Sequence, residues 1–228
     1  PGSQFFDIDL ISDKSNSLPH MIPASKTFEK HVSRLGIKNS DLVIIYDGIG
    51  LQSAARVWWT FKLFGHKKVG ILNGGFPKWL SENLPVEKKI NTRVKSEYKS
   101  KFNKKIIRNY EQIFDNITSK KEQIIDARSK GRFLGIDPEP RENLASGNIP
   151  GSLNLPFQEL ILESNKTIKN TEDIQNTFKK AGITFEKPII TTCGSGITAS
   201  VLAYCLHLIG FYNYSVYDGS WVEWVSTK

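Results

Sequence analysis

The sequence predicts an α/β fold made of two tandem domains, each a mainly parallel sheet flanked by helices. Three observations support this prediction. An apolar run, a helix-like run and a second apolar run follow one another at 41–79 and again at 187–224. Each helix-like run ends at a glycine, Gly65 or Gly210, as expected of a helix C-terminus. Strand, helix and strand in this order require parallel pairing with a right-handed crossover.

The individual elements follow from these runs. In the first half, we expect a buried strand in DLVIIYDG, a helix of about three turns in SAARVWWTFKLFG and a strand in KKVGILNGGFPKW. The corresponding segments of the second half are KPIITTCG, TASVLAYCLHLIG and YNYSVYDGSWVEW. Each second strand is expected to run into a turn that contains glycine, an aromatic residue and tryptophan.

A weaker repeat predicts that the N-terminal domain is truncated at its start. PGSQFFDID at 1–9 resembles IPGSLNLPF at 149–157, which is preceded by EQIIDARSKGRFLG, a predicted strand ending at Asp126. Nothing corresponds to that strand ahead of Pro1, so the first sheet would keep an unpaired edge. An atypical first domain is the alternative.

The charge distribution predicts the domain boundaries. The formal net charge is +8, and KKINTRVKSEYKSKFNKKIIR holds nine Lys or Arg and one Glu. We therefore expect an N-terminal domain at 1–87, a basic linker at 88–108 and a C-terminal domain at 109–228. The linker lacks the aromatic spacing of a base-stacking surface, which favours a solvated connector over a nucleic-acid contact.

Composition excludes several classes of protein. No run approaches the roughly 18 apolar residues of a membrane span, and the chain does not open with a signal peptide, although an upstream targeting segment stays possible. Two cysteines, Cys193 and Cys205, and four scattered histidines indicate neither a disulfide framework nor a zinc site. We expect a cytoplasmic protein with no metal or organic cofactor, no membrane contact and no nucleic-acid partner.

The loop TTCGSGITAS at 191–200 has the features of a nucleophilic cysteine site. Cys193 ends a predicted buried strand, and two glycines permit the sharp turn that follows. Amide groups at the start of the next helix would then point into one concavity, which favours an anion and a thiolate. The loop residues expected to bind the anionic substrate are Gly194, Gly196, Ile197 and Thr198.

Other interpretations of this loop are weaker. Gly194-x-Gly196-x-x-Ala199 followed by Asp218 imitates a dinucleotide fingerprint, but only ten residues follow Asp218. A Cys-x5-Arg phosphatase loop would need arginine where Ala199 stands. A buried inert cysteine is the third interpretation, and it is the one expected for Cys205 on the apolar face of the next helix.

CGSGITA closely resembles the active-site loop of the 3-mercaptopyruvate sulfurtransferases, which are two-domain relatives of rhodanese. Similar segments cover nearly the whole chain: FFDIDLISD, HMIP, SAARVWW, DARSKGRFLGIDPEPR, SGNIPGSLNLPF and YDGSWVEW. Thiosulfate-using rhodaneses typically carry basic residues where this chain has Gly194 and Ser195. A thiosulfate sulfurtransferase is the runner-up, and a non-catalytic rhodanese module that binds an anion is the alternative from another class.

The resemblance implies two rhodanese-like domains with the active site between them. Cys193 would take sulfur from 3-mercaptopyruvate as a persulfide, release pyruvate, and pass the sulfur to cyanide or to a thiol such as thioredoxin or a small thiol. The family's proton-handling residues fall on Ser195, His20 and Asp9. Its two carboxylate-binding arginines fall on Arg132 and Arg141.

Each of these residues also has an ordinary structural interpretation. Asp9 in FFDID is compatible with a surface acid, and His20 with a loop residue. Arg132 and Arg141 are compatible with solvated side chains or with partners of Glu139.

Two further positions are expected to matter for structure. Arg128, just past a strand end, can tie down loops by hydrogen bonds. Asn148 stands where the family usually has His, a departure expected to affect loop packing more than chemistry.

Overall fold

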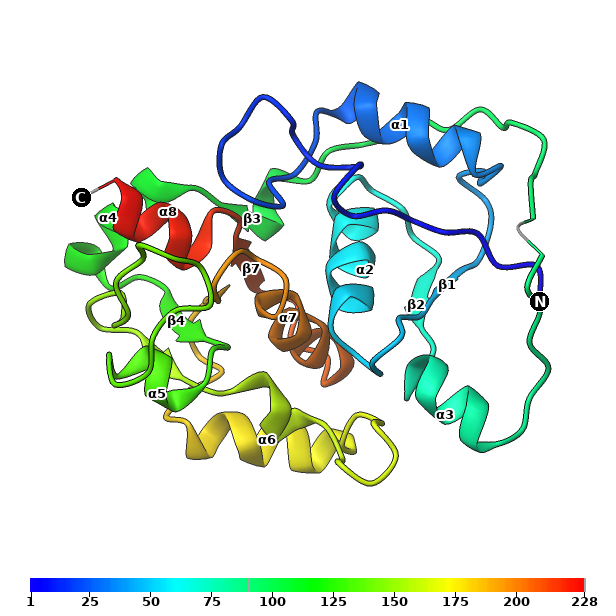
Figure 1. Cartoon of the computed structure of the whole chain (residues 1–228). Coiled ribbons are helices and arrows are strands. Elements are labelled where there is room, and N and C mark those ends of the chain that lie inside the picture. The colour runs from blue at the N-terminus through cyan, green and yellow to red at the C-terminus, as the bar shows by residue number, and fades with distance from the viewer. Residues whose placement is uncertain (90, 228) are drawn as a thin grey trace.

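The structure is a computed structural model that describes residues 1–89 and 91–227. The two halves of the chain each contain a parallel sheet with helices around it (Figure 1). They meet along two helices that lie side by side, α2 (Ser53–Leu63) and α7 (Ala199–Leu208). The predicted α/β fold with two parallel-sheet domains is confirmed.

The N-terminal half contains one strand–helix–strand unit, as predicted. β1 and β2 are parallel, and α2 connects them. The segment predicted as a glycine–aromatic–tryptophan turn instead begins a short helix, α3. Besides α2, the elements of this half are α1 (Ser25–Arg34), β1 (Val43–Ile45), β2 (Val69–Ile71) and α3 (Gly75–Ser81).

The C-terminal half contains a five-stranded parallel sheet in the order β3-β7-β6-β4-β5. Its central strand β6 is paired on both sides, and β4 ends at Asp126 as predicted. The strands are β3 (Ile107–Arg108), β4 (Gln123–Asp126), β5 (Leu153–Asn154), β6 (Ile189–Thr192) and β7 (Tyr214–Tyr217).

Helices surround this sheet and complete the second half. The glycine and tryptophans of YDGSWVEW again lead into a helix, α8, rather than a turn. Besides α7, the helical elements are η1 (Lys104–Ile106), α4 (Tyr110–Ser119), α5 (Lys130–Phe133), η2 (Phe157–Leu160), α6 (Thr171–Lys180) and α8 (Ser220–Ser226).

The predicted glycine caps end both interface helices. Gly65 and Gly210 have φ angles of +82° and +80°, a left-handed conformation that glycine adopts without steric cost. Their amide groups donate 3.1 Å hydrogen bonds to the carbonyls of Lys62 and His207. After each glycine the chain reverses and continues into the next parallel strand, β2 or β7.

The halves share a hydrophobic core across α2 and α7. Trp58 and Trp59 of α2 pack in one cluster with apolar residues of α7 and of the five-stranded sheet. The opposite side of α2 enters a second cluster inside the N-terminal half, in which Phe28, Phe61 and Phe64 pack together. Helix α2 is therefore buried on two sides and joins the halves mechanically.

From residue 91 on, the basic segment runs along the N-terminal half, passes α1 and returns to the second sheet (Figure 1). Tyr98 is buried against Phe28, with ring centroids 5.8 Å apart, and the Asn103 amide donates to the Leu63 carbonyl. Its last two residues form β3 and pair with β7. The segment expected to be a solvated connector is thus anchored on both halves.

The two-stranded sheet leaves apolar side chains in contact with solvent. Leu42, Ile44 and Tyr46, at and around β1, are 68%, 53% and 42% exposed. Among the described residues, β1 pairs only with β2. Within residues 1–89 and 91–227, no helix combines the length and apolarity required to cross a bilayer.

Candidate active site

Cys193 lies directly after β6, at the carboxyl edge of the five-stranded sheet. It is 2% exposed, and its amide donates to Ser220 Oγ at 3.3 Å. The Cys193 and Gly194 carbonyls accept hydrogen bonds from the Trp221 and Val222 amides at 2.9 and 3.1 Å. The loop is thereby held against the first turn of α8, which fixes the position of the thiol.

The loop after Cys193 contains a row of unbonded amide groups. The amides of residues 194–198 donate no hydrogen bond to any residue that the structure describes. These five groups precede α7, whose N-terminus carries the positive end of the helix dipole. Such an arrangement favours an anionic group in the loop.

The two loop glycines have different structural roles. Gly196 has a φ of +79°, and a Cβ there would lie 2.7 Å from Arg56 Nη1 and 2.9 Å from the Asp218 carbonyl. Gly194 is not in the left-handed region, so the expectation that both glycines supply unusual backbone angles is wrong for Gly194. Its missing side chain instead makes room for Arg132 Nη2, which would lie 3.1 Å from a Cβ.

The remaining predicted loop residues form the approach to α7. The Ile197 carbonyl accepts a 3.1 Å hydrogen bond from the Ser200 amide, and Thr198 is the residue that precedes the helix. Both are partly exposed. They can therefore contact a molecule bound above Cys193 through their amides.

Asp9, His20 and Ser195 lie in hydrogen-bonding contact across the two halves. His20 Nδ1 is 3.0 Å from Ser195 Oγ, and His20 Nε2 is 3.2 Å from Asp9 Oδ1. The backbone of His20 is left-handed, with a φ of +60°, which is uncommon outside glycine. The structure thus brings together three of the predicted residues, which are far apart in sequence.

The surroundings of His20 favour its neutral form. Burial lowers the pKa of His20, the positive charges of Arg141 and Arg56 lower it further, and Asp9 opposes them. A carboxylate can only accept a hydrogen bond, so Nε2 of a neutral ring carries the proton. Nδ1 is then the acceptor for the Ser195 hydroxyl. The resting arrangement can take a proton from Ser195.

The two predicted substrate arginines have different environments. Arg132 Nε and Nη2 donate to Glu139 at 3.1 and 2.5 Å. Arg132 therefore pairs with Glu139, as its ordinary structural interpretation predicted. Arg132 Nη2 nevertheless faces Gly194. Arg141 is exposed and has no hydrogen bond or ion pair with another described residue. Its positive charge lowers the pKa of His20, so Arg141 lies within electrostatic reach of that ring.

Arg128 holds the surrounding loops together, in agreement with its structural interpretation. Its guanidinium is fully buried, donates to Asp126, Glu139 and the Gly147 carbonyl, and lies 4.4 Å from the Trp221 ring centroid. Asn148, at the departure from the family pattern, donates a 3.1 Å hydrogen bond to the Phe133 carbonyl. Its contact is with the last residue of α5.

Sequence analysis missed two buried charged residues beside this site. Arg56 in α2 and Asp218 after β7 form a 2.6 Å ion pair, with side chains 4% and 3% exposed. The available signal was a single arginine inside the apolar run SAARVWW. Asp218 entered the sequence analysis only as part of a dinucleotide fingerprint, and its carboxylate is occupied by Arg56.

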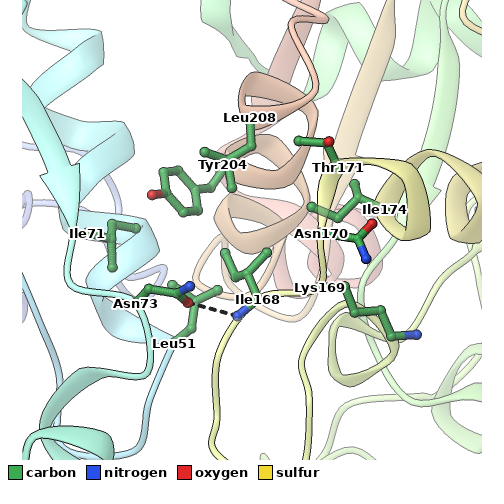
Figure 2. A pocket seen from close by; sticks show the side chains of 10 residues that line it. All are labelled: Leu51, Ile71, Asn73, Ile168, Lys169, Asn170, Thr171, Ile174, Tyr204 and Leu208. Atoms are coloured by element: carbon green, nitrogen blue, oxygen red, sulfur yellow. Dashed lines mark hydrogen bonds between the residues drawn. The ribbon is translucent and has the colours of Figure 1, made fainter.

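The cavity in Figure 2 is separate from these residues. It has a volume of about 200 Å³ and lies between β2, the segment preceding α6, and α7. None of the predicted site residues lines it, and its walls are mainly apolar.

Cys205 of α7 is fully buried, and burial raises the pKa of its thiol. No cluster of metal-ligating side chains occurs among the described residues.

Comparison with known proteins identifies relatives over the whole fold. The rhodanese-like domain model matches residues 1–82 and 110–227. The chain is 42% identical to rat 3-mercaptopyruvate sulfurtransferase over 226 residues, covering 98% of this chain and 76% of the rat protein. It is 40% identical to bovine thiosulfate sulfurtransferase over 227 residues, again covering 98% and 76%.

A solved structure agrees with the fold in space. The crystal structure of Tum1 from Saccharomyces cerevisiae superimposes with a TM-score of 0.92 at 38% identity, covering 100% of this chain and 80% of Tum1. The nearly equal identities to the rat and bovine enzymes do not distinguish the two sulfur donors. The donor has to be inferred from the chemistry of the site.

Proposed function

The chain belongs to the tandem-domain rhodanese sulfurtransferases, and from this premise we propose that its sulfur donor is 3-mercaptopyruvate. The observation that carries the proposal is the contact of His20 with both Ser195 and Asp9. A proton relay beside the nucleophile suits a donor whose leaving group must be protonated. The pyruvate enolate is such a leaving group, whereas sulfite leaves thiosulfate as a stable anion.

The first half-reaction forms one bond and breaks one. The Cys193 thiolate attacks the donor sulfur, the sulfur–carbon bond breaks, and its electron pair remains on pyruvate as the enolate. Cys193 becomes a persulfide. The proton released when Cys193 ionises is held by His20 as an imidazolium beside Asp9 and returns through Ser195 to the enolate. Thiol and donor are thereby converted into persulfide and pyruvate with no net proton.

The second half-reaction regenerates the enzyme. An acceptor thiolate, of a small thiol or of a protein such as thioredoxin, or cyanide attacks the outer sulfur of the persulfide. The sulfur–sulfur bond breaks, and Cys193 leaves as a thiolate. The unbonded amides of residues 194–198 support this step, because they favour an anion at the loop. We place the reaction in a reducing compartment, because the two described cysteines are free.

The charges around the loop also favour mercaptopyruvate. Thiosulfate is a dianion that would be stabilised by a cation next to the attacked sulfur. Positions 194 and 195 supply none, and the charge of the neighbouring Arg132 is paired with Glu139. Mercaptopyruvate carries its carboxylate away from its sulfur. Arg141 is free to bind that carboxylate. Arg132 lies beside Gly194, and its Nε and Nη2 donate hydrogen bonds to Glu139.

The function is tested by measuring both donors side by side on the purified chain. With mercaptopyruvate and a thiol acceptor, we expect pyruvate formation at a higher kcat/KM than that for thiocyanate formation from thiosulfate and cyanide. A preference for thiosulfate would make the protein a thiosulfate sulfurtransferase. Absence of a cyanide-releasable sulfur after exposure to either donor would leave only a binding role.

Arg141→Gln is expected to weaken donor binding. A charge-assisted hydrogen bond contributes about 1.5 to 3 kcal/mol, so kcat/KM for mercaptopyruvate should fall about 10- to 150-fold. Most of the loss should appear in KM, because the carboxylate is bound equally before and during sulfur transfer. Steady-state pyruvate assays measure it, with Arg34→Gln at the end of α1 as the control. Unchanged kinetics at subsaturating donor would remove Arg141 from the site.

A further inference from the structure

The Arg56–Asp218 ion pair connects the two halves at the candidate site. Arg56 projects from α2 of the N-terminal half, and Asp218 follows β7 of the C-terminal half. Removing both charges from water is costly, and such pairs often stabilise a fold no better than apolar residues of similar size. Stability alone is therefore a weak reason for this pair.

Both members of the pair also bind the backbone of the two loops that form the site. Arg56 Nη2 donates to the His20 carbonyl at 2.5 Å, and Asp218 Oδ2 accepts from the Ile22 amide at 3.0 Å. The pair thus holds the segment 20–22 at both ends. Arg56 Nη1 also lies 3.4 Å from the Gly196 carbonyl, on the Cys193 loop.

These contacts act on a backbone that needs restraint. His20 has a left-handed φ of +60°, a conformation that persists only where the surroundings impose it. Gly196, at +79°, approaches Arg56 and Asp218 so closely that a side chain would collide with both. The guanidinium itself is held over the Trp59 ring at 4.6 Å. The donors and acceptors are thus fixed on rigid elements on both sides.

We propose that Arg56 and Asp218 are positioning residues that hold the His20 segment and the Gly196 turn in register, so that His20 reaches Ser195. The inference rests on the proposed function only for its effect on rate. Neither side chain reacts with substrate. They act through the 3.0 Å contact between His20 Nδ1 and Ser195 Oγ, which joins two loops from different halves.

Arg56→Gln should therefore slow chemistry rather than donor binding. We expect kcat for mercaptopyruvate to fall about 10- to 100-fold, since displacement of a catalytic group by about 1 Å has an effect of that size. KM should stay within roughly threefold. Arg108→Gln is the matched control, because it removes a two-hydrogen-bond pair with Glu122 whose side chains contact neither loop.

The double variant Arg56→Gln/Asp218→Asn separates positioning from stability. Removing both charges relieves the uncompensated buried charge of either single variant, so melting should return near the wild-type temperature. The kcat should stay as low as in Arg56→Gln. Recovery of both melting temperature and kcat in the double variant would show that the pair is only structural and would overturn the proposal.

A donor-independent measurement keeps this test apart from the function. In 15N-labelled protein, assigned with His20→Gln, the ring nitrogens of His20 report its hydrogen bonds, and His31 serves as an internal control. In folded Arg56→Gln, we expect the ring-nitrogen chemical shifts of His20 to change and those of His31 to stay the same. The substitution should also raise the His20 pKa, because a cation has been removed while Arg141 and Asp9 remain.

Unchanged His20 signals in the folded variant would overturn the positioning role. If wild-type protein failed to use mercaptopyruvate, the proposed donor would fail, and the His20 signals would still decide the role of the pair.

Discussion

Cys193→Ser is expected to abolish sulfur transfer from either donor, by at least about 10³-fold, while Cys205→Ala stays active. Cys193 follows β6 in a loop of unbonded amides, where a thiolate is favoured. Cys205 is enclosed in α7, and burial raises the pKa of its thiol, so it stays protonated and out of reach of a donor. A hydroxyl at position 193 is too weak a nucleophile to replace the thiolate.

Pyruvate and thiocyanate assays measure this difference, and intact-mass spectrometry tests its cause. After exposure to donor, wild-type protein and Cys205→Ala should gain the mass of one sulfur atom, and Cys193→Ser should not. Circular dichroism verifies that each variant is folded. Equal loss of activity in two folded cysteine variants would contradict a single nucleophile at Cys193.

His20→Gln is expected to have the second largest effect, and a selective one. Without the ring, Ser195 loses the group that receives and returns its proton, so kcat for mercaptopyruvate should fall about 10²- to 10⁴-fold. Transfer from thiosulfate to cyanide should fall less, since sulfite leaves without a proton and only the ionisation of Cys193 loses its acceptor. Asp9→Asn should be milder, because the Asp9 side chain is 73% exposed and its charge is screened by water.

The ratio of the two donor activities is the informative measurement. His31→Gln in α1 is the matched control, since that histidine has no part in the relay. If His20→Gln lowered both donor activities equally in a folded protein, His20 would have a structural rather than a proton-transfer role. If it lowered neither, the relay would not take part in the reaction.

Local signals made the fold predictable. The runs around β6 and α7 carry their own periodicity, and Gly210 ends the helix by a conformation that the residue itself permits. The end of β4 at Asp126 was also predicted from a local apolar run. The helices α3 and α8 were missed, because seven residues with several aromatic side chains resemble a turn when their packing is unknown.

The site was predictable only in part, because its contacts are long-range. Cys193 was predicted from the features of its own loop, whereas the roles of Ser195, Asp9 and His20 came from a family resemblance. Nothing near Arg132 in sequence decides between solvent, substrate and Glu139 as its partner. The choice depends on how the loop around residues 130–147 folds. The role of Arg56 depends on a residue far along the chain, so no local pattern could reveal it.

The two sheets differ in size, and their strands should therefore differ in how easily they unfold locally. Strand β6 is paired on both sides, so its amide hydrogens should exchange with solvent only when the whole protein unfolds. β1 has a single partner strand and exposed apolar neighbours, so its amides should exchange through smaller fluctuations at lower free energy. Asp9 and His20 belong to that less protected half, and Cys193 follows the protected strand. On warming, β1 should therefore open before β6, while the buried Arg56–Asp218 pair keeps the His20 segment attached to the C-terminal half.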